Sequence, residues 1–336
     1  MIRVAIIGCG HWGPNYIRNF KDILDSDVTW CCDSDTERLK NIGNRFPEIN
    51  TTTKDLDIVE NNDIDAVIVA TPASTHYEIV KTCLQAGKHV LVEKPITTNI
   101  EHAEHLVEIT ENTNRILMVG HIFLYNSGIQ KMKEYITKGD FGQIYYLYST
   151  RTNLGPVRRD VNVAWDLAPH DVSIFGYLLN SQPLWVSATG TKALKNHNCD
   201  VSFITIGYPE DVIANIHVSW LDPNKVREIA VVGSQKRIIF NDLDTQEMIR
   251  IYEKGISCIN QPNNYGDFLR FSVRDGDIIS PKIDINEPLK NQCQHFLDCI
   301  KNNSDPLTNA QNGMDIVKIL SAIQKSLDRN GTTVEV

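Results

Sequence analysis

A glycine pattern near the start of the chain constrains the fold more than any other feature. The apolar run Ile2–Ile7 is followed at once by Gly8-Cys9-Gly10-His11-Trp12-Gly13, and a helix-forming stretch comes next. Where a G-x-G-x-x-G pattern joins a strand to a helix, the glycines permit a tight turn, close approach of the backbone to a pyrophosphate, and close helix–strand packing. We therefore expect a dinucleotide-binding turn, whose cofactor contacts are Gly8, Gly10, His11, Trp12 and Gly13. A turn of purely structural role is the alternative.

An acidic residue supports the dinucleotide interpretation. Asp33 lies 20 residues after Gly13, at the end of the next apolar run, where a carboxylate can accept hydrogen bonds from both ribose hydroxyls of the adenosine. A 2′-phosphate would be repelled there by Asp33 and Asp35, so the sequence favours NAD over NADP. Arg38 argues against this preference because it can turn toward a phosphate, although it can equally stack on adenine or lie in solvent.

The order of the predicted elements indicates an α/β protein of two domains. Up to about residue 122, short β-branched runs alternate with helical stretches, which is typical of a doubly wound parallel sheet of the Rossmann type. We expect domain one at residues 1–122, with strands at Ile2–Ile7, Val28–Cys32, Thr51–Thr53, Ala66–Ala70, His89–Val92 and Ile116–Val119.

Residues 123–336 are expected to form an α+β domain with a large, mainly antiparallel, open-faced sheet. Its strands are predicted at Ile144–Thr150, Trp185–Gly190, Val201–Gly207, Val212–Ser219, Glu228–Val232, Arg237–Asn241 and Met248–Tyr252. Two closing amphipathic helices, Pro288–Lys301 and Ala310–Arg329, are expected to pack on this sheet. The segment Asn260–Ile285 is rich in Asn, Asp, Gly and Pro, so we expect a long loop, a lid or a subunit contact there.

Composition argues against several functional classes. The 336-residue chain carries a formal net charge of −9, which gives no general attraction to nucleic acid or to anionic lipid. It has no apolar run long enough for a membrane span or signal peptide, and its eight cysteines form no C-x-x-C pair, as expected of reduced thiols in a cytoplasmic protein. His102 and His105 lie three residues apart on a predicted helix without a third ligand, so we predict no metal site.

Two motifs follow the fourth and fifth predicted strands, at the edge of the sheet where such folds bind ligands. The first is Thr71-Pro72 with His76 shortly after it, and the second is Glu93-Lys94-Pro95. Pro95 restricts the backbone of Lys94. The Lys94 ammonium can stabilise negative charge as a hydroxyl loses its proton, which every oxidation of an alcohol to a ketone requires. An ordinary solvated lysine is the alternative.

A second group of candidate residues lies in the second domain. The sequence Trp165-Asp166-Leu167-Ala168-Pro169-His170-Asp171 precedes an apolar helical run, and Pro169 is acceptable in a first turn. His170 is then expected near a helix start, as a neutral imidazole that can take a proton from a sugar hydroxyl. Asp166 shares its helix face if the helix extends back that far, and can orient the ring or bind a hydroxyl. A structural histidine is the alternative.

These motifs together resemble the Gfo/Idh/MocA oxidoreductases over nearly the whole chain. Further points of likeness are Val119-Gly120-His121 and the closing pattern from Glu287-Pro288-Leu289 through Phe296 to the last helix. The resemblance implies a Rossmann domain, a second domain whose sheet often forms an oligomer interface, and substrates among sugars, cyclitols and nucleotide-linked sugars. It places Lys94, Asp166 and His170 at the catalytic positions. By the same resemblance, Thr71, His76 and Glu93 would line the nicotinamide half of the cofactor site, and Pro72 and Lys94 are further expected cofactor contacts.

The sequence departs from the family pattern at one point and narrows the resemblance at another. Where many members have an arginine after the Gly-His pair, this chain has Ile122-Phe123-Leu124-Tyr125-Asn126, so Tyr125 and Asn126 are the candidates to replace its substrate contact. The stretch 152–160 resembles the branch that oxidises UDP-linked N-acetylamino sugars at C3. Within it, Arg158 and Arg159 can bind a diphosphate or a uronate carboxylate, or can be surface or oligomer contacts.

We therefore hypothesise an NAD-dependent dehydrogenase that oxidises UDP-GlcNAc or its 6-carboxylate to the 3-oxo sugar. His170 would remove the hydroxyl proton, Lys94 would polarise the same oxygen, and the hydride would pass to nicotinamide C4. A dehydrogenase of free sugars or inositol, or a ketosugar reductase, is the alternative within the family. A nucleotide-responsive regulator without turnover is the alternative of another class. We expect a homo-oligomer, dimer or tetramer, formed through the second sheet.

Overall fold

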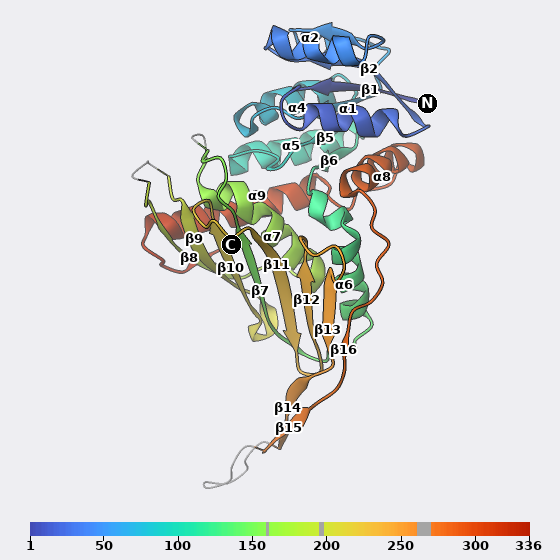
Figure 1. The fold of residues 1–336 in the computed structure, drawn as a ribbon. Helices are drawn as coiled ribbons and strands as arrows, with labels where there is room; N and C mark the ends of the chain where they lie inside the picture. Colours follow the sequence, from blue (N-terminus) through green and yellow to red (C-terminus); the bar gives the residue numbers. More distant parts are fainter. Residues whose placement is uncertain (159–160, 195–197, 261–269) are drawn as a thin grey trace. The chain divides into compact units, whose positions relative to one another are not determined.

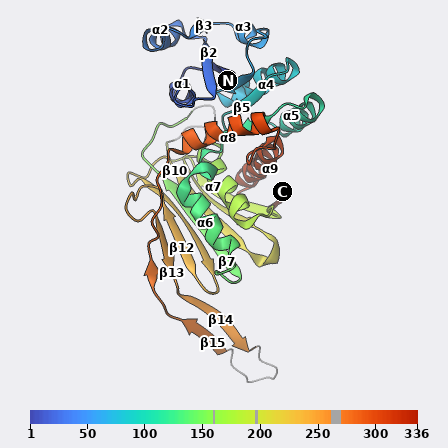
Figure 2. The same ribbon diagram turned by 90° about the vertical axis from the view of Figure 1, so that its right-hand side faces the viewer.

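The computed structural model describes residues 1–158, 161–194, 198–260 and 270–336. Within these ranges the chain divides into two units, whose elements are labelled in Figures 1 and 2. Unit 1 comprises Met1–Tyr125 and Asn286–Lys318, and unit 2 comprises Asn126–Ile285 and Ile319–Val336. A single boundary after residue 122 does not account for the segment 286–318, which returns to unit 1.

Unit 1 contains a six-stranded parallel sheet in the order β3-β2-β1-β4-β5-β6, so the predicted doubly wound sheet is confirmed. Its central strands are buried on both faces, which explains their continuous apolar runs. The strand order reverses between β1 and β4, and folds of this kind bind ligands beside that point, at the carboxyl ends of the strands. The strands are β1 (Ile2–Ile7), β2 (Ser26–Cys32), β3 (Asn50–Thr52), β4 (Ala66–Val69), β5 (His89–Val92) and β6 (Leu117–Val119).

Helices connect these strands, and several begin at a side chain that caps the first turn. Asp35 accepts hydrogen bonds from two N–H groups of α2, and Asn99 accepts one from α5. The helical elements of unit 1 are α1 (Gly13–Lys21), α2 (Thr36–Arg45), α3 (Leu56–Val59), η1 (Ala73–Thr75), α4 (His76–Gln85), α5 (Ile100–Thr113), η2 (Ile122–Tyr125), α8 (Pro288–Asn302) and the first half of α9 (Ala310–Asp328).

The position of α8 differs from the sequence-based expectation. The helix forms at the predicted residues but packs on α1 in unit 1, so its expected place on the second sheet is wrong. Arg18 of α1 donates to the Glu287 carboxylate just before α8, with 3.0 Å between Nη1 and Oε2. Further along, Thr308 and Val119 exchange two hydrogen bonds of 2.7 Å at the edge of β6. An amphipathic pattern predicts a buried face, but it does not predict the partner.

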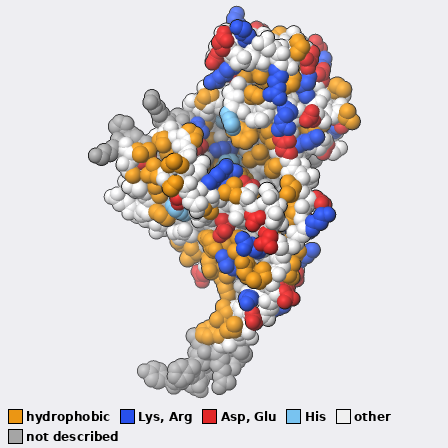
Figure 3. Space-filling view, viewed as in Figure 1, with side chains coloured by type: hydrophobic (Ala, Val, Ile, Leu, Met, Phe, Trp, Pro, Cys, Tyr) orange, Lys and Arg blue, Asp and Glu red, His pale blue; other side chains and the backbone are white. Residues whose placement is uncertain are grey.

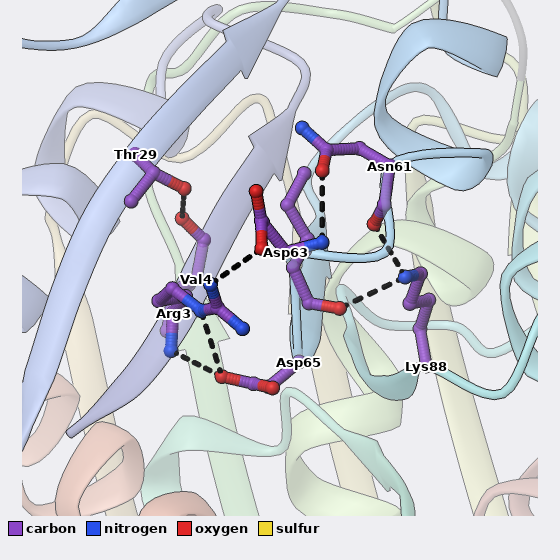
Figure 4. Close-up of polar contacts among 8 residues, drawn as sticks. Arg3, Val4, Thr29, Asn61, Asp63, Asp65 and Lys88 are labelled. Atoms are coloured by element: carbon purple, nitrogen blue, oxygen red, sulfur yellow. Dashed lines mark hydrogen bonds and ion pairs between the residues drawn. The ribbon is translucent and has the colours of Figure 1, made fainter.

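The amino-terminal edge of the first sheet is closed by buried polar contacts (Figure 4). The Lys88 side chain is 4 % exposed and donates to the carbonyl oxygens of Asn61 and Ile64 at 2.6 and 2.9 Å. The Arg3 backbone N–H donates to Asp65 at 2.8 Å. Burial lowers the pKa of Lys88. These contacts tie together the starts of β1, β4 and β5, at the edge opposite the glycine turn.

Unit 2 contains a nine-stranded sheet in the order β16-β13-β12-β11-β7-β10-β9-β8-β17, and the predicted, mainly antiparallel sheet is confirmed. Among its strand pairs, β7 and β10 run parallel and the others run antiparallel. The strands are β7 (Ile144–Thr152), β8 (Trp185–Thr191), β9 (Val201–Gly207), β10 (Ile213–Ser219), β11 (Val226–Gly233), β12 (Arg237–Asn241), β13 (Ile249–Tyr252), β16 (Ile278–Ile279) and β17 (Val334–Glu335).

The expected long loop at 260–285 is partly wrong. Its described part contains β15 (Arg270–Arg274) and β16, and β15 pairs with β14 (Gly255–Asn260) as a separate hairpin, while residues 261–269 lie outside the described ranges. Ile256 and Val273 face each other across the hairpin and are exposed, and hydrophobic side chains gather over this hairpin in Figure 3. The short strands were missed because polar residues and glycines interrupt their apolar pattern.

Helices α6 (Ser127–Thr137) and α7 (Val163–Leu179) cover one face of the second sheet (Figure 2). Along β7, Leu147, Ser149 and Arg151 are buried on that face, as the two-residue period of a strand requires. Arg151 binds Asp171 of α7 through two hydrogen bonds, of 2.9 and 3.1 Å. Both side chains are almost fully buried, so this ion pair attaches α7 to the sheet.

Replacing Asp171 tests this attachment. Asp171→Asn leaves the Arg151 guanidinium buried without its carboxylate, so we expect the free energy of unfolding to fall by about 3–5 kcal/mol in a urea titration. The matched control is Glu134→Gln, which breaks the exposed Lys131–Glu134 pair and should leave the urea midpoint unchanged. An equal, negligible loss in both variants would contradict a structural role for the buried pair.

Candidate active site

The glycine turn at the end of β1 has no room for side chains at two of its three glycines. Gly8 has φ +102°, and a Cβ there would lie 2.5 Å from the carbonyl oxygen of Ala70. A Cβ on Gly13 would lie 2.1 Å from the carbonyl oxygen of Gly8, so α1 begins directly against the turn. A Cβ on Gly10 would meet only the Arg38 guanidinium, at 3.5 Å. The neighbouring His11 ring is exposed and packs edge-on against Trp12 at 5.5 Å.

Asp33 lies at the end of β2, where the sequence predicted it. Its two carboxylate oxygens accept hydrogen bonds from the backbone N–H groups of Cys9 and Asp35, at 2.7 and 2.8 Å. The side chain thus fastens the glycine turn to the neighbouring strand. Arg38 lies beside this group, with its guanidinium nitrogens 3.6 Å from Asp33 and 3.4 Å from Asp35. The sequence analysis considered a phosphate, adenine or solvent as the surroundings of Arg38, and did not foresee this position against two carboxylates.

His76 joins the two loops that follow β4 and β5. Its ring is buried, with Nδ1 2.8 Å from the Pro95 carbonyl oxygen and Nε2 2.9 Å from that of Thr71. The Thr71 hydroxyl accepts a hydrogen bond from Thr75 at 2.8 Å, and Pro72 is exposed beside it. Because carbonyl oxygens only accept, a ring with hydrogen on both nitrogens satisfies both contacts. The residues predicted on the nicotinamide half are therefore neighbours in unit 1.

Glu93 lies in a buried network that the sequence did not predict. Its Oε1 accepts from the Tyr16 hydroxyl at 2.7 Å and its Oε2 from the Lys94 backbone N–H at 3.2 Å. Gln292 donates to the Tyr16 oxygen at 3.0 Å. Burial raises the pKa of Glu93, and the hydrogen bond from Tyr16 and the charge of Lys94 oppose that shift. No spacing in the sequence could connect Gln292 with Tyr16, which lies 276 residues earlier.

His121 is a second titratable group beside Lys94 that was not predicted as a site residue. Its side chain is fully buried, and neither ring nitrogen has a hydrogen-bond partner within the described ranges. Val92 of β5 pairs with Val119 of β6. Lys94 lies two residues after Val92, and His121 lies two residues after Val119. Burial, and then the Lys94 charge, lower the pKa of His121 to about 3. This imidazole is therefore neutral at physiological pH.

The expected position of His170 near a helix start is wrong. Helix α7 begins at Val163, capped by Asn162, whose side chain accepts from the Trp165 N–H at 3.0 Å. Pro169 lies inside the helix, and His170 lies two turns from its start, so a helix-start potential does not account for a neutral ring. Asn162 is a typical N-cap, and the sequence analysis overlooked it in favour of Pro169. His170 and Asp166 do lie in one helix at the spacing that shares a face.

Asp166, in the first turn of α7, accepts hydrogen bonds from two side chains among the described residues of unit 2. Its Oδ1 accepts from Arg158 at 3.2 Å and its Oδ2 from the indole N–H of Trp220 at 3.1 Å. Trp220 is buried and was not singled out by the sequence analysis. Arg158, a candidate for anion binding, therefore lies one helical turn from His170. Arg159 lies outside the described residues.

Tyr125 and Asn126, the two candidates for the missing arginine, have partners within their own units. Tyr125 is buried, with its hydroxyl 3.2 Å from that of Thr308. Asn126 caps α6 by accepting from the Gly128 N–H at 2.8 Å, and its amide donates to Asp242 at 3.3 Å. These contacts have a structural role, and substrate binding by either residue stays a prediction.

The described residues contain neither a group of metal ligands nor a membrane-spanning helix. In the ranges that the structure describes, no three His, Cys, Asp or Glu side chains are grouped to hold a metal ion. His102 instead stacks on Tyr77 at 3.8 Å, and His105 lies 2.6 Å from the Tyr77 hydroxyl. No helix in the same ranges is both long and apolar enough to span a membrane.

Models of one protein family match both parts of the chain. The model described as "Oxidoreductase family, NAD-binding Rossmann fold" matches residues 2–121, and the "GFO/IDH/MocA C-terminal domain" matches residues 129–239. The chain belongs to the Gfo/Idh/MocA oxidoreductases. It is an NAD-dependent oxidoreductase, with its cofactor domain in unit 1.

Individual relatives agree on the fold and differ in substrate. The chain is 25 % identical to UDP-N-acetylglucosamine 3-dehydrogenase of Acidithiobacillus ferrooxidans, over 77 % of this chain and 79 % of that one. It is 23 % identical to myo-inositol 2-dehydrogenase of Thermotoga maritima, over 97 % and 96 %. Solved structures of the Acidithiobacillus enzyme and of GenD2 from gentamicin A biosynthesis with NAD superpose with TM-scores of 0.81 and 0.83. The Acidithiobacillus structure is 22 % identical in sequence, and the match covers 98 % of this chain and 98 % of that one. GenD2 is 20 % identical, and the match covers 100 % of this chain and 96 % of GenD2.

The residues of the turn fit an NAD molecule. Gly10 leaves the backbone open to a pyrophosphate, and the Asp33 carboxylate lies where the adenosine ribose is bound in such folds. A 2′-phosphate would approach two carboxylates, Asp33 and Asp35, against one guanidinium. This arrangement agrees with NAD as the cofactor.

Substituting one glycine tests the fit. A Cβ in Gly13→Ala would overlap the Gly8 carbonyl oxygen, which must then move, so we expect NAD affinity measured by calorimetry to fall at least about tenfold. The matched control is Gly43→Ala in α2, where nothing lies within 4 Å of the added Cβ. That variant should bind NAD normally and gain roughly 0.5–1 kcal/mol of stability. Unchanged NAD affinity in a folded Gly13→Ala protein would contradict the role given to the turn.

Proposed function

We propose that this dehydrogenase oxidises C3 of a UDP-linked N-acetylamino sugar, UDP-GlcNAc or its 6-carboxylate, with NAD as hydride acceptor. The observation that carries the proposal lies in the first two turns of α7, where the partly exposed Arg158 is held beside Asp166, one turn from His170. A guanidinium binds diphosphate or carboxylate oxygens through paired hydrogen bonds, whereas a neutral cyclitol offers no such group. The match to an enzyme named for this reaction supports the same substrate class.

In the proposed mechanism, three side chains of this chain act on the sugar. His170 takes the proton of the C3 hydroxyl, and the Lys94 ammonium stabilises the negative charge on the same oxygen. Asp166 holds Arg158 toward the anionic part of the substrate through their 3.2 Å contact. NAD, when bound, accepts the hydride from C3. The product is a 3-oxo sugar, which is suited to a later transamination.

The cofactor contacts of unit 1 form the second part of the proposal. Asp33 would bind the adenosine ribose, and the glycine turn with His11 and Trp12 would bind the pyrophosphate. Thr71, Pro72 and His76 would border the nicotinamide half, together with Glu93 and Lys94. The ring of His76 would hold the two loops in place through its carbonyl contacts.

An inositol dehydrogenase is a second candidate, favoured by the extent of the sequence match. The match to scyllo-inositol 2-dehydrogenase (NAD(+)) of Bacillus subtilis covers 99 % of this chain at 24 % identity. The two substrate classes differ in the diphosphate. A nucleotide-responsive regulator without turnover has no need of a proton acceptor and an ammonium group. The presence of both His170 and Lys94 therefore argues against a regulatory function.

A substrate panel distinguishes the candidates. We expect NADH formation, free or enzyme-bound, with UDP-GlcNAc or its 6-carboxylate and NAD. Turnover should be at least about tenfold lower with GlcNAc or myo-inositol, because these compounds lack the anion that Arg158 would bind. It should be lower by a similar factor with NADP, because Asp33 and Asp35 would repel the 2′-phosphate. Adding a 2-oxo acid reveals cofactor that is recycled in place. Turnover of inositol but not of UDP sugars would contradict the proposed substrate.

The Lys94→Met variant tests the proposed role of Lys94 in the same assay. It removes the ammonium but keeps an unbranched side chain only one heavy atom shorter, so turnover should fall by roughly 10²–10⁴-fold while NAD affinity stays nearly unchanged. An unchanged rate would remove Lys94 from the mechanism.

We also propose that a second copy of the chain covers the outer face of the second sheet. Tyr146 pairs with Ile213, and Phe203 pairs with His217, on the face opposite α7. The Tyr146, Ile213 and Phe203 side chains are 45, 45 and 50 % exposed, so this face of the sheet exposes several large side chains with apolar surface. Homo-oligomers commonly use such self-complementary patches.

The oligomer proposal predicts a change in mass. We expect a dimer or larger assembly in analytical ultracentrifugation, and a monomer when Phe203→Glu is combined with Ile213→Lys, because buried unpaired charge opposes association. Leu24→Glu is the matched control, since Leu24 is an exposed apolar residue of unit 1. A monomeric wild-type protein would contradict the proposal.

A further inference from the structure

A buried chain of hydrogen bonds connects two helices of unit 1 with the backbone of Lys94. It begins at Gln292 in α8, whose amide donates to the Tyr16 oxygen at 3.0 Å. Tyr16, in α1, donates to Glu93 Oε1 at 2.7 Å, and the Lys94 N–H donates to Glu93 Oε2 at 3.2 Å. Tyr16 and Gln292 are fully buried, and Glu93 is 9 % exposed. The four residues therefore form one continuous polar path through an apolar layer.

The direction of these hydrogen bonds determines what they do to Glu93. A tyrosine hydroxyl has a single hydrogen, and because Gln292 donates to its oxygen, that hydrogen is directed to Glu93. Glu93 then accepts at both oxygens, which is the pattern that stabilises a carboxylate and not a carboxylic acid. Gln292 Oε1 is buried without a partner within the described ranges, and the Gln292 amide nitrogen donates to the Tyr16 oxygen.

The charged and titratable groups around Glu93 act in both directions. Burial is the largest influence and raises the pKa of Glu93, while the Tyr16 hydrogen bond, the charge and N–H of Lys94, and His11 lower it. Cys293 of α8 also faces the carboxyl, and burial together with Glu287 and Glu93 raises the pKa of its thiol. A carboxylate this deeply buried persists only while donors satisfy it.

The helices that carry Tyr16 and Gln292 are fastened to each other independently. Arg18 and Asn19 of α1 both donate to the Glu287 carboxylate, which directly precedes α8. Two long-range contacts thus fix the spacing of α1 and α8, so the Tyr16 hydroxyl is held against Glu93 and not merely near it. The Glu93–Lys94 peptide directly follows the end of β5, and the Lys94 N–H donates to the Glu93 carboxylate that Tyr16 contacts.

We propose that Tyr16 and Gln292 are positioning residues, which hold Glu93 as a carboxylate and thereby fix Lys94 and keep a negative charge beside it. This inference rests on the proposed role of Lys94 in hydride transfer. Glu93 itself can still border the nicotinamide, because the proposal concerns its ionisation and its hold on Lys94. A merely structural network would affect stability without changing the titration of Glu93.

The titration of Glu93 tests the proposal directly. Difference infrared spectroscopy follows the C=O band of the protonated carboxyl group against pH in the full-length protein, and Glu93→Gln identifies the band by its loss. In Tyr16→Phe one donor is lost, so protonation becomes easier and the midpoint should rise by about one pH unit or more. Gln292→Met should shift it in the same direction by less, because Tyr16 keeps its hydrogen.

The pH profile of kcat supplies a second readout. If activity needs ionised Glu93, it is lost as the pH falls through the pKa of that group, so a raised pKa moves the acid limb of the profile to higher pH. The matched control is Tyr77→Phe, which removes the hydroxyl that contacts His105 in the same unit and should leave both readouts unchanged.

Two outcomes would overturn the inference. One is a folded Tyr16→Phe protein with an unshifted Glu93 midpoint. The other, decisive where Tyr16→Phe does not fold, is a Gln292→Met protein whose midpoint and kcat profile both match the wild type. The infrared titration needs no substrate, so the network can fail while the proposed function stands. Conversely, a chain inactive on every sugar would refute the function and leave the titration interpretable.

Discussion

Parallel pairing of the strands in unit 1 is the constraint on which the candidate site depends. Because all six strands point the same way, the residues that follow them meet at one edge. Gly8, Asp33 and Thr71 reach that edge from β1, β2 and β4, and Lys94 and His121 reach it from β5 and β6. Each of these residues is remote in sequence from most of the others. Their meeting follows from strand direction and register, and the opposite edge is closed by contacts such as those of Lys88.

Long-range contacts then fix the chemistry at this edge. Asp33 fastens the glycine turn, His76 joins two loops through their carbonyl oxygens, and Glu93 receives two donors in a buried position. His121, whose burial keeps its ring neutral, and the carboxyl group of Glu93 are both within electrostatic reach of Lys94. In unit 2, the buried Arg151–Asp171 pair attaches α7, and Asp166 is held by Arg158 and Trp220. In both units, buried polar contacts orient the predicted site residues.

Local patterns were enough to predict much of this architecture. The β-branched runs predicted most strands of both sheets, and β1, β5, β9 and β12 have the predicted bounds. The two-residue edge strands β16 and β17 of the second sheet were not predicted. The glycine turn and the position of Asp33 also followed from local spacing. Where the prediction failed, the deciding interaction was a competing cap or a distant partner. Asn162 caps α7, so the helix begins before the position that Pro169 suggested. Helix α8 packs on α1 of unit 1, where Arg18 donates to Glu287. The network of Tyr16 and Gln292 has no local signal at all.

We propose that Lys94 of unit 1 and His170 of unit 2 act on the same sugar oxygen, and this proposal can be tested directly. The most direct measurement is a crystal structure of the protein with NADH and UDP-GlcNAc bound. The account predicts that Lys94 Nζ and an imidazole nitrogen of His170 both lie about 3 Å from the C3 oxygen, with C3 facing nicotinamide C4. A complex in which the two side chains contact different parts of the substrate, or in which another carbon faces the nicotinamide, would contradict it.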